Sequence, residues 1–175
     1  ASRGLGDVYK RQGLRLVGSN ETLIKCWHLF TEAGVPSAGE RAWNTRRIEL
    51  GYPLSGSELS EEHNPWEAGL AQAIHMNKGC YIGQEVIARL DTYDKIKQHL
   101  VGITCEADSP PDTGTVLLAE EKPVGTITSG VYSPAFGPIA LAYVRRDYSR
   151  PDTVLKLAEG SHRCCVQSLP FIQAC

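Results

Sequence analysis

The stretch of this chain best suited to chemistry is KGCYIGQE, residues 78–85. Its two glycines, Gly79 and Gly83, allow positive φ angles and a close approach of the backbone to a ligand. Cys80 lies between them, just before an expected helix start, and Lys78 precedes it. A helix N-terminus and a lysine both stabilise an anion, so this arrangement favours a thiolate. A thiolate attacks electrophiles and binds soft metals, including the iron of iron–sulfur clusters.

Cys80 also has an ordinary interpretation. A lone cysteine is more often a small buried apolar residue than a reactive group. The two glycines could serve only a tight turn. The spacing alone therefore leaves both an active thiol and a packing residue open.

Helices are expected in the first half of the chain. Leu23, Trp27 and Phe30 recur at helical spacing after the capping residues Ser19 and Asn20, and a glycine follows at position 34. Residues 37–40 have the pattern of a capping box for a second helix, for which Gly51 is the expected stop and whose apolar face carries Ala42, Trp43 and Leu50. The expected elements are a short strand over residues 13–18, helices over 20–33, 38–50 and 84–90, a weakly helical stretch over 66–73, and a loop with acidic residues Glu58, Glu61 and Glu62 over 52–65.

The second half of the chain has the pattern of a small all-β domain. Short apolar, β-branched runs alternate there with glycine and proline, which is typical of a barrel or sandwich. The expected strands are residues 100–105, 115–118, 124–128, 139–144, 154–157 and 164–169. We place the domain boundary near residues 95–99, which predicts an α+β fold with domains at 13–96 and 97–175.

The composition excludes several classes of protein. With 42% hydrophobic residues, 22% charged residues and a net charge of −2, the chain has neither a basic nucleic-acid footprint nor a basic membrane patch. No apolar run is long enough to span a bilayer. The six cysteines include no C-x-x-C pair, which argues against a secreted disulfide framework and favours a reducing cytosol. Adjacent Cys164 and Cys165 would point to opposite faces of a strand, so a bond between them is not expected. No spacing of histidines matches a metal site.

The first residues need separate treatment. Residues 2–12, SRGLGDVYKRQ, can be back-translated into a sequence that resembles a transposase-library sequencing adaptor. We therefore expect residues 1–12 to be an artefact, leave them out of the fold prediction, and expect the natural start of the protein to lie upstream.

The string KGCYIGQE resembles the signature K-G-C-[FY]-x-G-Q-E of the YgfZ family of folate-binding proteins and matches each fixed position. Residues 44–53 resemble the family's N-x-L-R-I-E-x-G-x-P helix end, and residues 64–70 its P-x-E-A-G-L segment. Residues 125–144 resemble a run in the C-terminal barrel that the family shares with the glycine cleavage T-protein. The resemblance covers residues 13 to about 171. It implies the C-terminal part of an aminomethyltransferase-like folate-binding domain followed by a small antiparallel β-barrel.

The resemblance also implies a function. Members of the family bind tetrahydrofolate and support the assembly or repair of iron–sulfur clusters, so folate and iron–sulfur client or assembly proteins are the implied partners. Cys80 is the implied reactive residue. The implied folate-binding residues are Arg47, Glu49, Glu67, Lys78, Gly79, Tyr81, Gly83, Gln84 and Glu85. An arginine suits the carboxylates of folate and a glutamate suits the N–H donors of the pterin.

Some of these residues have simpler interpretations. Arg47 and Glu49 could be solvated helix charges, and Glu67 could be an acid favoured at a helix start. Arg46 stands where the family usually has an apolar residue, which leaves open which of the two arginines reaches a ligand; alignment favours Arg47.

Two other functions stay open at this point. The first is a folate-dependent aminomethyltransferase of glycine cleavage, although such proteins usually read F-I-G-[RK]-E where this chain has residues 81–85 and lack the cysteine. The second is a barrel module that only binds a partner. Because most of the folate pocket is expected upstream, we predict that this chain alone binds folate poorly or not at all.

Overall fold

The computed structural model describes residues 16–75, 78–92, 96–160 and 162–172. The elements are α1 (Asn20–Glu32), α2 (Glu40–Glu49), the 3-10 helix η1 (Ala71–Ala73), α3 (Gln84–Thr92), β1 (Gln98–Cys105), β2 (Val116–Ala119), β3 (Lys122–Ser133), β4 (Gly137–Arg145), the 3-10 helix η2 (Arg146–Tyr148), β5 (Val154–Leu157) and β6 (Arg163–Gln167). The chain divides into two compact units, one that holds α1 and one that begins at Arg41 and holds the β-strands.

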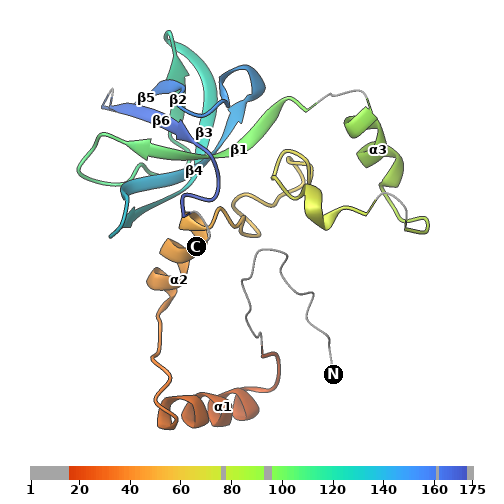
Figure 1. The fold of residues 1–175 in the computed structure, drawn as a ribbon, viewed down its shortest axis with the longest axis vertical. Coiled ribbons are helices and arrows are strands. Elements are labelled where there is room, and N and C mark those ends of the chain that lie inside the picture. The colour runs from red at the N-terminus through yellow and green to blue at the C-terminus, as the bar shows by residue number, and fades with distance from the viewer. Residues whose placement is uncertain (1–15, 76–77, 93–95, 161, 173–175) are drawn as a thin grey trace. The chain divides into compact units, whose positions relative to one another are not determined.

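The six strands form a closed antiparallel barrel in the order β1-β4-β3-β2-β5-β6, with β6 paired to β1 (Figure 1). Closure removes the unpaired edges that would otherwise expose backbone donors and acceptors. The predicted α+β class and the predicted antiparallel barrel are both confirmed, and each of the six expected strands is present.

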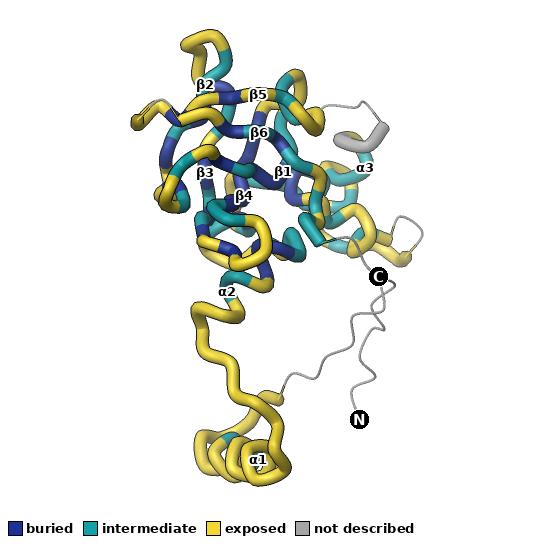
Figure 2. The backbone as a smooth tube through the Cα atoms, turned by 60° about the vertical axis from the view of Figure 1, so that its left-hand side comes forward, coloured by how far each residue is buried: buried dark blue, intermediate teal, exposed yellow. Residues whose placement is uncertain are grey.

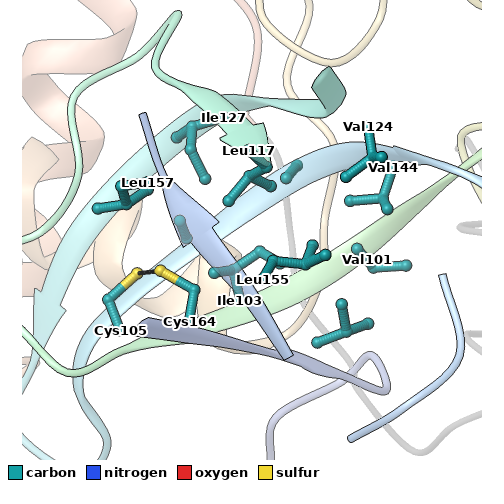
Figure 3. Packing of buried hydrophobic residues seen from close by; sticks show 13 residues of the cluster. Val101, Ile103, Cys105, Leu117, Val124, Ile127, Val144, Leu155, Leu157 and Cys164 are labelled. Atoms are coloured by element: carbon teal, nitrogen blue, oxygen red, sulfur yellow. Dashed lines mark hydrogen bonds between the residues drawn. The ribbon is translucent and has the colours of Figure 1, made fainter. Parts of the chain in front are cut away.

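The barrel interior is filled by the inward-facing residues of every strand. Because side chains alternate between faces, Val101, Ile103 and Cys105 of β1 point inward, as do Ala140 and Ala142 of β4. Figure 3 shows how branched side chains from facing strands meet in this cluster. Small residues on β4 leave room for the branched side chains across from them.

The side chains on the outer face of β4 are buried as well, although the outer face of a barrel strand usually meets solvent. Ile139, Leu141 and Tyr143 form a second cluster with Ile48 of α2. Figure 2 shows β4 as a largely buried strand. The C-terminal segment joins this cluster through Phe171, whose backbone N–H donates to the Glu49 carbonyl at 2.9 Å. The end of α2 and the C-terminal segment therefore cover one wall of the barrel.

Helix α2 ends in a tight cap that directs the chain onto the barrel. The Gly51 N–H donates to the Ile48 carbonyl at 2.9 Å, and the Tyr52 N–H to the Arg47 carbonyl at 2.7 Å. This pair of bonds is a Schellman motif, and it needs a residue with positive φ at Gly51, where φ is 69°. The glycine stop expected from the sequence is confirmed.

Strand β3 contains a bulge opposite β4. Ile127 pairs with Ala142 and Ser129 with Leu141, so Thr128 is an extra residue in β3. A bulge changes the face to which the following side chains point. Ile127 lies in the barrel interior, whereas the side chains of Thr128 and Ser129 both reach the outer wall covered by α2.

Other sequence expectations need correction. Residues 16–18 are not in a strand, while residues 13–15 of that expected strand lie outside the described residues. Residues 66–70 form turns rather than a helix, and only residues 71–73 are helical. Trp43, expected on the apolar face of α2, is 56% exposed, because only the last turn of this helix meets the barrel.

Helix α1 forms where it was expected, with Ser19 as its cap. It buries no residue within its own unit. The boundary that we expect between the two domains after residue 96 stays a prediction. The packing unit itself spans that position, because the segment from Arg41 onward packs on the barrel.

Candidate functional site

The centre of the region predicted to bind folate is a buried ion pair between Arg47 and Glu58. Arg47 Nη1 lies 2.9 Å from Glu58 Oε2, and the two side chains are 5% and 0% exposed. Arg47 Nε donates to Asn44 Oδ1 at 2.8 Å, and Nη2 donates to Ser129 Oγ at 2.7 Å. Nη1 also lies 3.4 Å from the Tyr52 carbonyl oxygen. Arg47 is therefore not a solvated helix charge, and its guanidinium already has partners within the chain.

Glu58 accepts from several donors in addition to Arg47. The Leu54 N–H donates to Oε2 at 2.9 Å, and the Ser129 hydroxyl donates to Oε1 at 2.6 Å. The Thr128 hydroxyl lies 2.7 Å from Oε1 and 3.0 Å from the Leu141 carbonyl, so its hydrogen is shared. Two consecutive strand residues reach one carboxylate only because of the bulge in β3. A buried carboxylate needs this many donors, because unpaired burial of a charge is strongly unfavourable.

Tyr143 of β4 extends the same network. Its hydroxyl donates to the backbone carbonyl of Glu58 at 2.9 Å, and the His63 ring stacks on its ring with centroids 3.6 Å apart. Burial raises the pKa of the Tyr143 hydroxyl well above its usual value, and the nearby carboxylates of Glu58 and Glu67 add to the rise. Tyr143 is thus a neutral hydrogen-bond donor at ordinary pH.

Two of the three predicted carboxylates, Glu49 and Glu67, are also engaged. Glu49 Oε1 accepts from the Ser133 hydroxyl at 2.8 Å, and Oε2 lies 3.2 Å from Nη1 of Arg46, whose side chain is 54% exposed. Glu67 Oε2 accepts from the Asn64 N–H at 3.2 Å, while Asn64 Oδ1 accepts from the Glu67 N–H at 3.0 Å. This reciprocal pair has the form of a capping box, but it closes a turn, because residues 65–69 form turns rather than a helix.

These contacts show how far the described residues fit a folate. Every buried side-chain nitrogen and oxygen in the described part of the chain has a hydrogen-bond partner, so none there is left waiting for a ligand. Two hollows among the described residues lie elsewhere, one along α1 and one of about 260 Å³ beside residues 107–112. Neither of these two hollows is lined by a residue that was predicted to bind folate.

The KGCYIGQE segment has a different character, because it is largely exposed. Cys80 is an exposed free thiol, and Lys78 and Glu85 are exposed as well. The Lys78 ammonium lies 4.4 Å from the centre of the half-buried Tyr81 ring. Gly83 has a φ of 87°, as the sequence suggested, whereas Gly79 has no positive φ. An added Cβ at either glycine would meet nothing within 4 Å. Among the described residues, Cys80 is therefore exposed rather than buried as a packing residue.

The last two residues of the segment, Gln84 and Glu85, begin α3, as expected. The Gln84 N–H donates to the Tyr81 carbonyl at 3.2 Å, and the exposed side chains of Glu85 and Arg89 form an ion pair along the helix at 2.6 Å. Trp66 Nε1 donates to the Ile87 carbonyl at 3.0 Å and so connects α3 to the segment that carries Glu67. The predicted residues thus form two groups: Arg47, Glu49 and Glu67 in buried networks, and residues 78–85 on an exposed segment.

Sequence reasoning missed Glu58 as the partner of Arg47. It stood out only as a member of an acidic loop, and nothing in its spacing marked it as buried. No signal in the sequence marks this pairing, because Thr128 and Ser129 are adjacent strand residues that would point to opposite faces without the bulge. The contact between Cys105 and Cys164 was also missed, since their closeness depends on barrel closure.

Two searches of the described residues gave negative results. No group of three or more histidine, cysteine, aspartate or glutamate side chains there could hold a metal ion. None of the helices formed by those residues combines the length and the apolar character needed to cross a membrane.

Comparison with family models matches both parts of the chain. Residues 98–173 match the glycine cleavage T-protein C-terminal barrel domain, and residues 12–78 match the GCVT N-terminal domain. The barrel match coincides with the six strands described above.

Individual relatives agree with these matches. A chloroplastic protein of Arabidopsis thaliana, named as a candidate transferase, is 38% identical over 144 residues, which cover 82% of this chain and 33% of that protein. An aminomethyltransferase of Koribacter versatilis is 41% identical over 126 residues, covering 71% of this chain and 33% of the relative. The solved structure of the glycine cleavage system aminomethyltransferase T from Bartonella henselae shares the fold, with a TM-score of 0.77 and 24% identity over 89% of this chain and 44% of that one.

The chain thus spans between a third and a half of the length of the curated relatives it matches. Two successive domain matches and a set of relatives named as aminomethyltransferases point the same way. The chain belongs to the glycine cleavage T-protein superfamily.

Proposed function

We propose that the whole protein to which this chain belongs binds tetrahydrofolate and acts as an accessory protein in the assembly or repair of iron–sulfur clusters in client enzymes. The observation that carries the proposal is Cys80, an exposed free thiol within KGCYIGQE. The resemblance of this string to the YgfZ signature supports the same role. We also place the protein in the cytoplasm as part of this proposal.

The exposure of Cys80 suits a role in contact with another molecule. A thiol that attacks an electrophile or binds the iron of a cluster must be reached from outside. Gly79 and Gly83 carry no side chains that would cover it, and an added Cβ at either would meet nothing within 4 Å. The neighbouring Ile82 is fully exposed and Val86 is 61% exposed, which gives the segment an apolar surface for a client or assembly protein.

For the folate, the geometry supports two kinds of residue. We propose that Lys78, Tyr81, Gln84 and Glu85 line the ligand site together with the backbone at Gly79 and Gly83. We propose that Arg47, Glu49 and Glu67 hold the wall of that site in shape, because their side chains are engaged with Glu58, Ser133 and Asn64. Folate would supply a carrier for one-carbon groups, and the residues of this chain would bind and orient it.

The test compares Cys80→Ser with a matched control, Cys26→Ser, in the whole protein. Cys26 is a half-buried free cysteine on α1. Both variants are expressed in a strain that lacks the native protein, and the activity of an iron–sulfur enzyme and the affinity for tetrahydrofolate are measured. We expect Cys80→Ser to lose support of the enzyme while it still binds folate, and Cys26→Ser to behave like the parent. Full support of the enzyme by Cys80→Ser would sink the proposal.

A second candidate function is a folate-dependent aminomethyltransferase. It is favoured by the relatives of that name, which match up to 93% of this chain. The sequence at residues 81–85 departs from the usual pattern of those enzymes, as noted above. Transfer of a one-carbon unit from an aminomethyl-lipoyl carrier to folate by the whole protein, unaffected by Cys80→Ser, would place this candidate first.

A further inference from the structure

Two cysteines that the proposed function does not use meet inside the barrel. Cys105 is the last residue of β1, and Cys164 is its direct partner on β6. Their sulfur atoms lie 2.8 Å apart, and the side chains are 8% and 1% exposed (Figure 3). The two thiols point toward each other from facing strands within the apolar cluster of the interior.

The hydrogen-bond register shows that the backbone suits a covalent bond at this position. The Glu106 N–H donates to the Arg163 carbonyl at 2.9 Å, which makes the next residue pair outward a hydrogen-bonded pair of the ladder. Cys105 and Cys164 are therefore a non-hydrogen-bonded pair, in which the Cα atoms of antiparallel strands lie about 4.5 Å apart. This separation is within the range of about 4.4–6.8 Å found across disulfides. Bond formation needs rotation of the two side chains and no strand movement.

The other described cysteines are placed so that they do not compete. Cys165 follows Cys164 on β6, and the alternation of the strand turns it to the opposite face, where it is half-buried. Cys80 lies on the exposed segment before α3. Among the described cysteines of the unit that holds the barrel, Cys105 therefore has Cys164 as its neighbour.

We propose that Cys105 and Cys164 are a redox modification site, a buried cross-strand dithiol that closes to a disulfide and staples β1 to β6. The co-reactant is a small-molecule disulfide of the glutathione class. The Cys105 thiolate attacks one sulfur of that disulfide, a mixed disulfide forms, and one small thiol leaves. The Cys164 sulfur then attacks the Cys105 sulfur and expels the second small thiol. The two protein thiols lose two electrons, and one disulfide becomes two thiols.

Two features assign the order of these steps. The contact with Cys164 lowers the pKa of the Cys105 thiol, and the same contact, together with burial, raises the pKa of the Cys164 thiol. Cys105 is also the more exposed of the two. Both sulfurs are largely buried, so thiol–disulfide exchange requires β1 and β6 to separate locally. The pair should therefore react more slowly than Cys80.

The test uses the full chain in glutathione buffers of increasing oxidation, followed by alkylation and mass spectrometry of unreduced peptides. We expect a linked Cys105–Cys164 peptide and a Tm at least about 5 °C higher, reversed by a reducing thiol, because the bond closes a long loop in the unfolded chain. Cys165→Ser should keep both effects, and Cys164→Ala should lose both.

The parent chain alone already decides the question, so the proposal does not depend on whether Cys164→Ala folds. Alkylation of both Cys105 and Cys164 at the most oxidising ratio, while Cys80 has become a mixed disulfide, would overturn the proposal. A bond from either residue to another cysteine, or a Cys105 that stays bound to glutathione, would also overturn it.

Discussion

Replacement of Glu58 by glutamine tests whether the Arg47–Glu58 ion pair stabilises the packing of residues 41–70 against the barrel. The substitution keeps the size of the side chain and removes its charge, which leaves the guanidinium of Arg47 without a counter-ion at a side-chain exposure of 5%. Breaking a buried ion pair from one side costs about 3–5 kcal/mol. We expect a loss near the lower limit, about 3 kcal/mol, because the amide oxygen can still accept from Arg47 while the amide N–H groups donate to the Thr128 and Ser129 hydroxyls.

Urea unfolding followed by circular dichroism gives this free energy directly. With an m-value of about 2 kcal/mol/M, a loss of about 3 kcal/mol lowers the midpoint by about 1.5 M at unchanged slope. The matched control is Glu85→Gln, which removes the acid of an exposed ion pair with Arg89. That change should alter the free energy of unfolding by no more than about 0.5 kcal/mol.

A double variant separates the pair from its individual charges. Arg47→Met with Glu58→Leu removes both charges together, so its loss of stability should be smaller than the sum of the losses of the two single variants, and the difference measures the coupling of the pair. If Glu58→Gln shifts the midpoint no more than Glu85→Gln does, the buried ion pair is not what holds this segment, and the argument from burial fails.

Three further changes have distinct expected results. Gly51→Ala should destabilise the chain by about 1–3 kcal/mol in the same urea assay, since Gly51 has a φ of 69° and an added Cβ would lie 2.9 Å from Leu169 Cβ; Gly79→Ala, which meets open space, is its control. Because the pKa of Tyr143 is raised, its contribution to stability is complete below about pH 10 and is lost as the pH rises further, so ultraviolet titration should show a late tyrosine that Tyr143→Phe removes. That variant should also lose about 1 kcal/mol at neutral pH with its hydrogen bond to the Glu58 carbonyl. Calorimetric titration of the isolated chain with tetrahydrofolate should show no micromolar binding, because the buried polar atoms of the described residues already have partners.

The barrel was predictable because its signals are local. Each strand reveals itself through alternation within a few residues, as with Val101, Ile103 and Cys105 on one face of β1. The glycine at position 51 marked the end of α2 for a similar reason, since the cap involves only the residues next to it. The closing order of the strands carries no such local signal.

The buried networks could not be predicted, because their members meet only after the barrel has closed. Arg47 and Ser129 are 82 residues apart in sequence, and the bulge that turns Ser129 outward has no mark in the alternation of β3. Sequence reasoning singled out Arg47 as a ligand-binding residue, and the structure shows Glu58 as its partner within this chain. Whether Arg47, Glu49 and Glu67 also contact folate in the whole protein stays a prediction.

A series of contacts leads from the barrel to the exposed segment that carries Cys80. The wall of β3 and β4 holds Glu58 through hydroxyls and Arg47, and the same segment continues to Trp66, whose indole N–H holds α3 at the Ile87 carbonyl. Glu58 and Arg47 are buried, Trp66 and Ile87 are half-buried, and Cys80, just before α3, is exposed. A thiol that must meet a folate, a cluster or a partner needs such a position, since access and burial exclude each other. A rigid wall that leads to an exposed segment therefore fits a binding or transfer role better than a structural one.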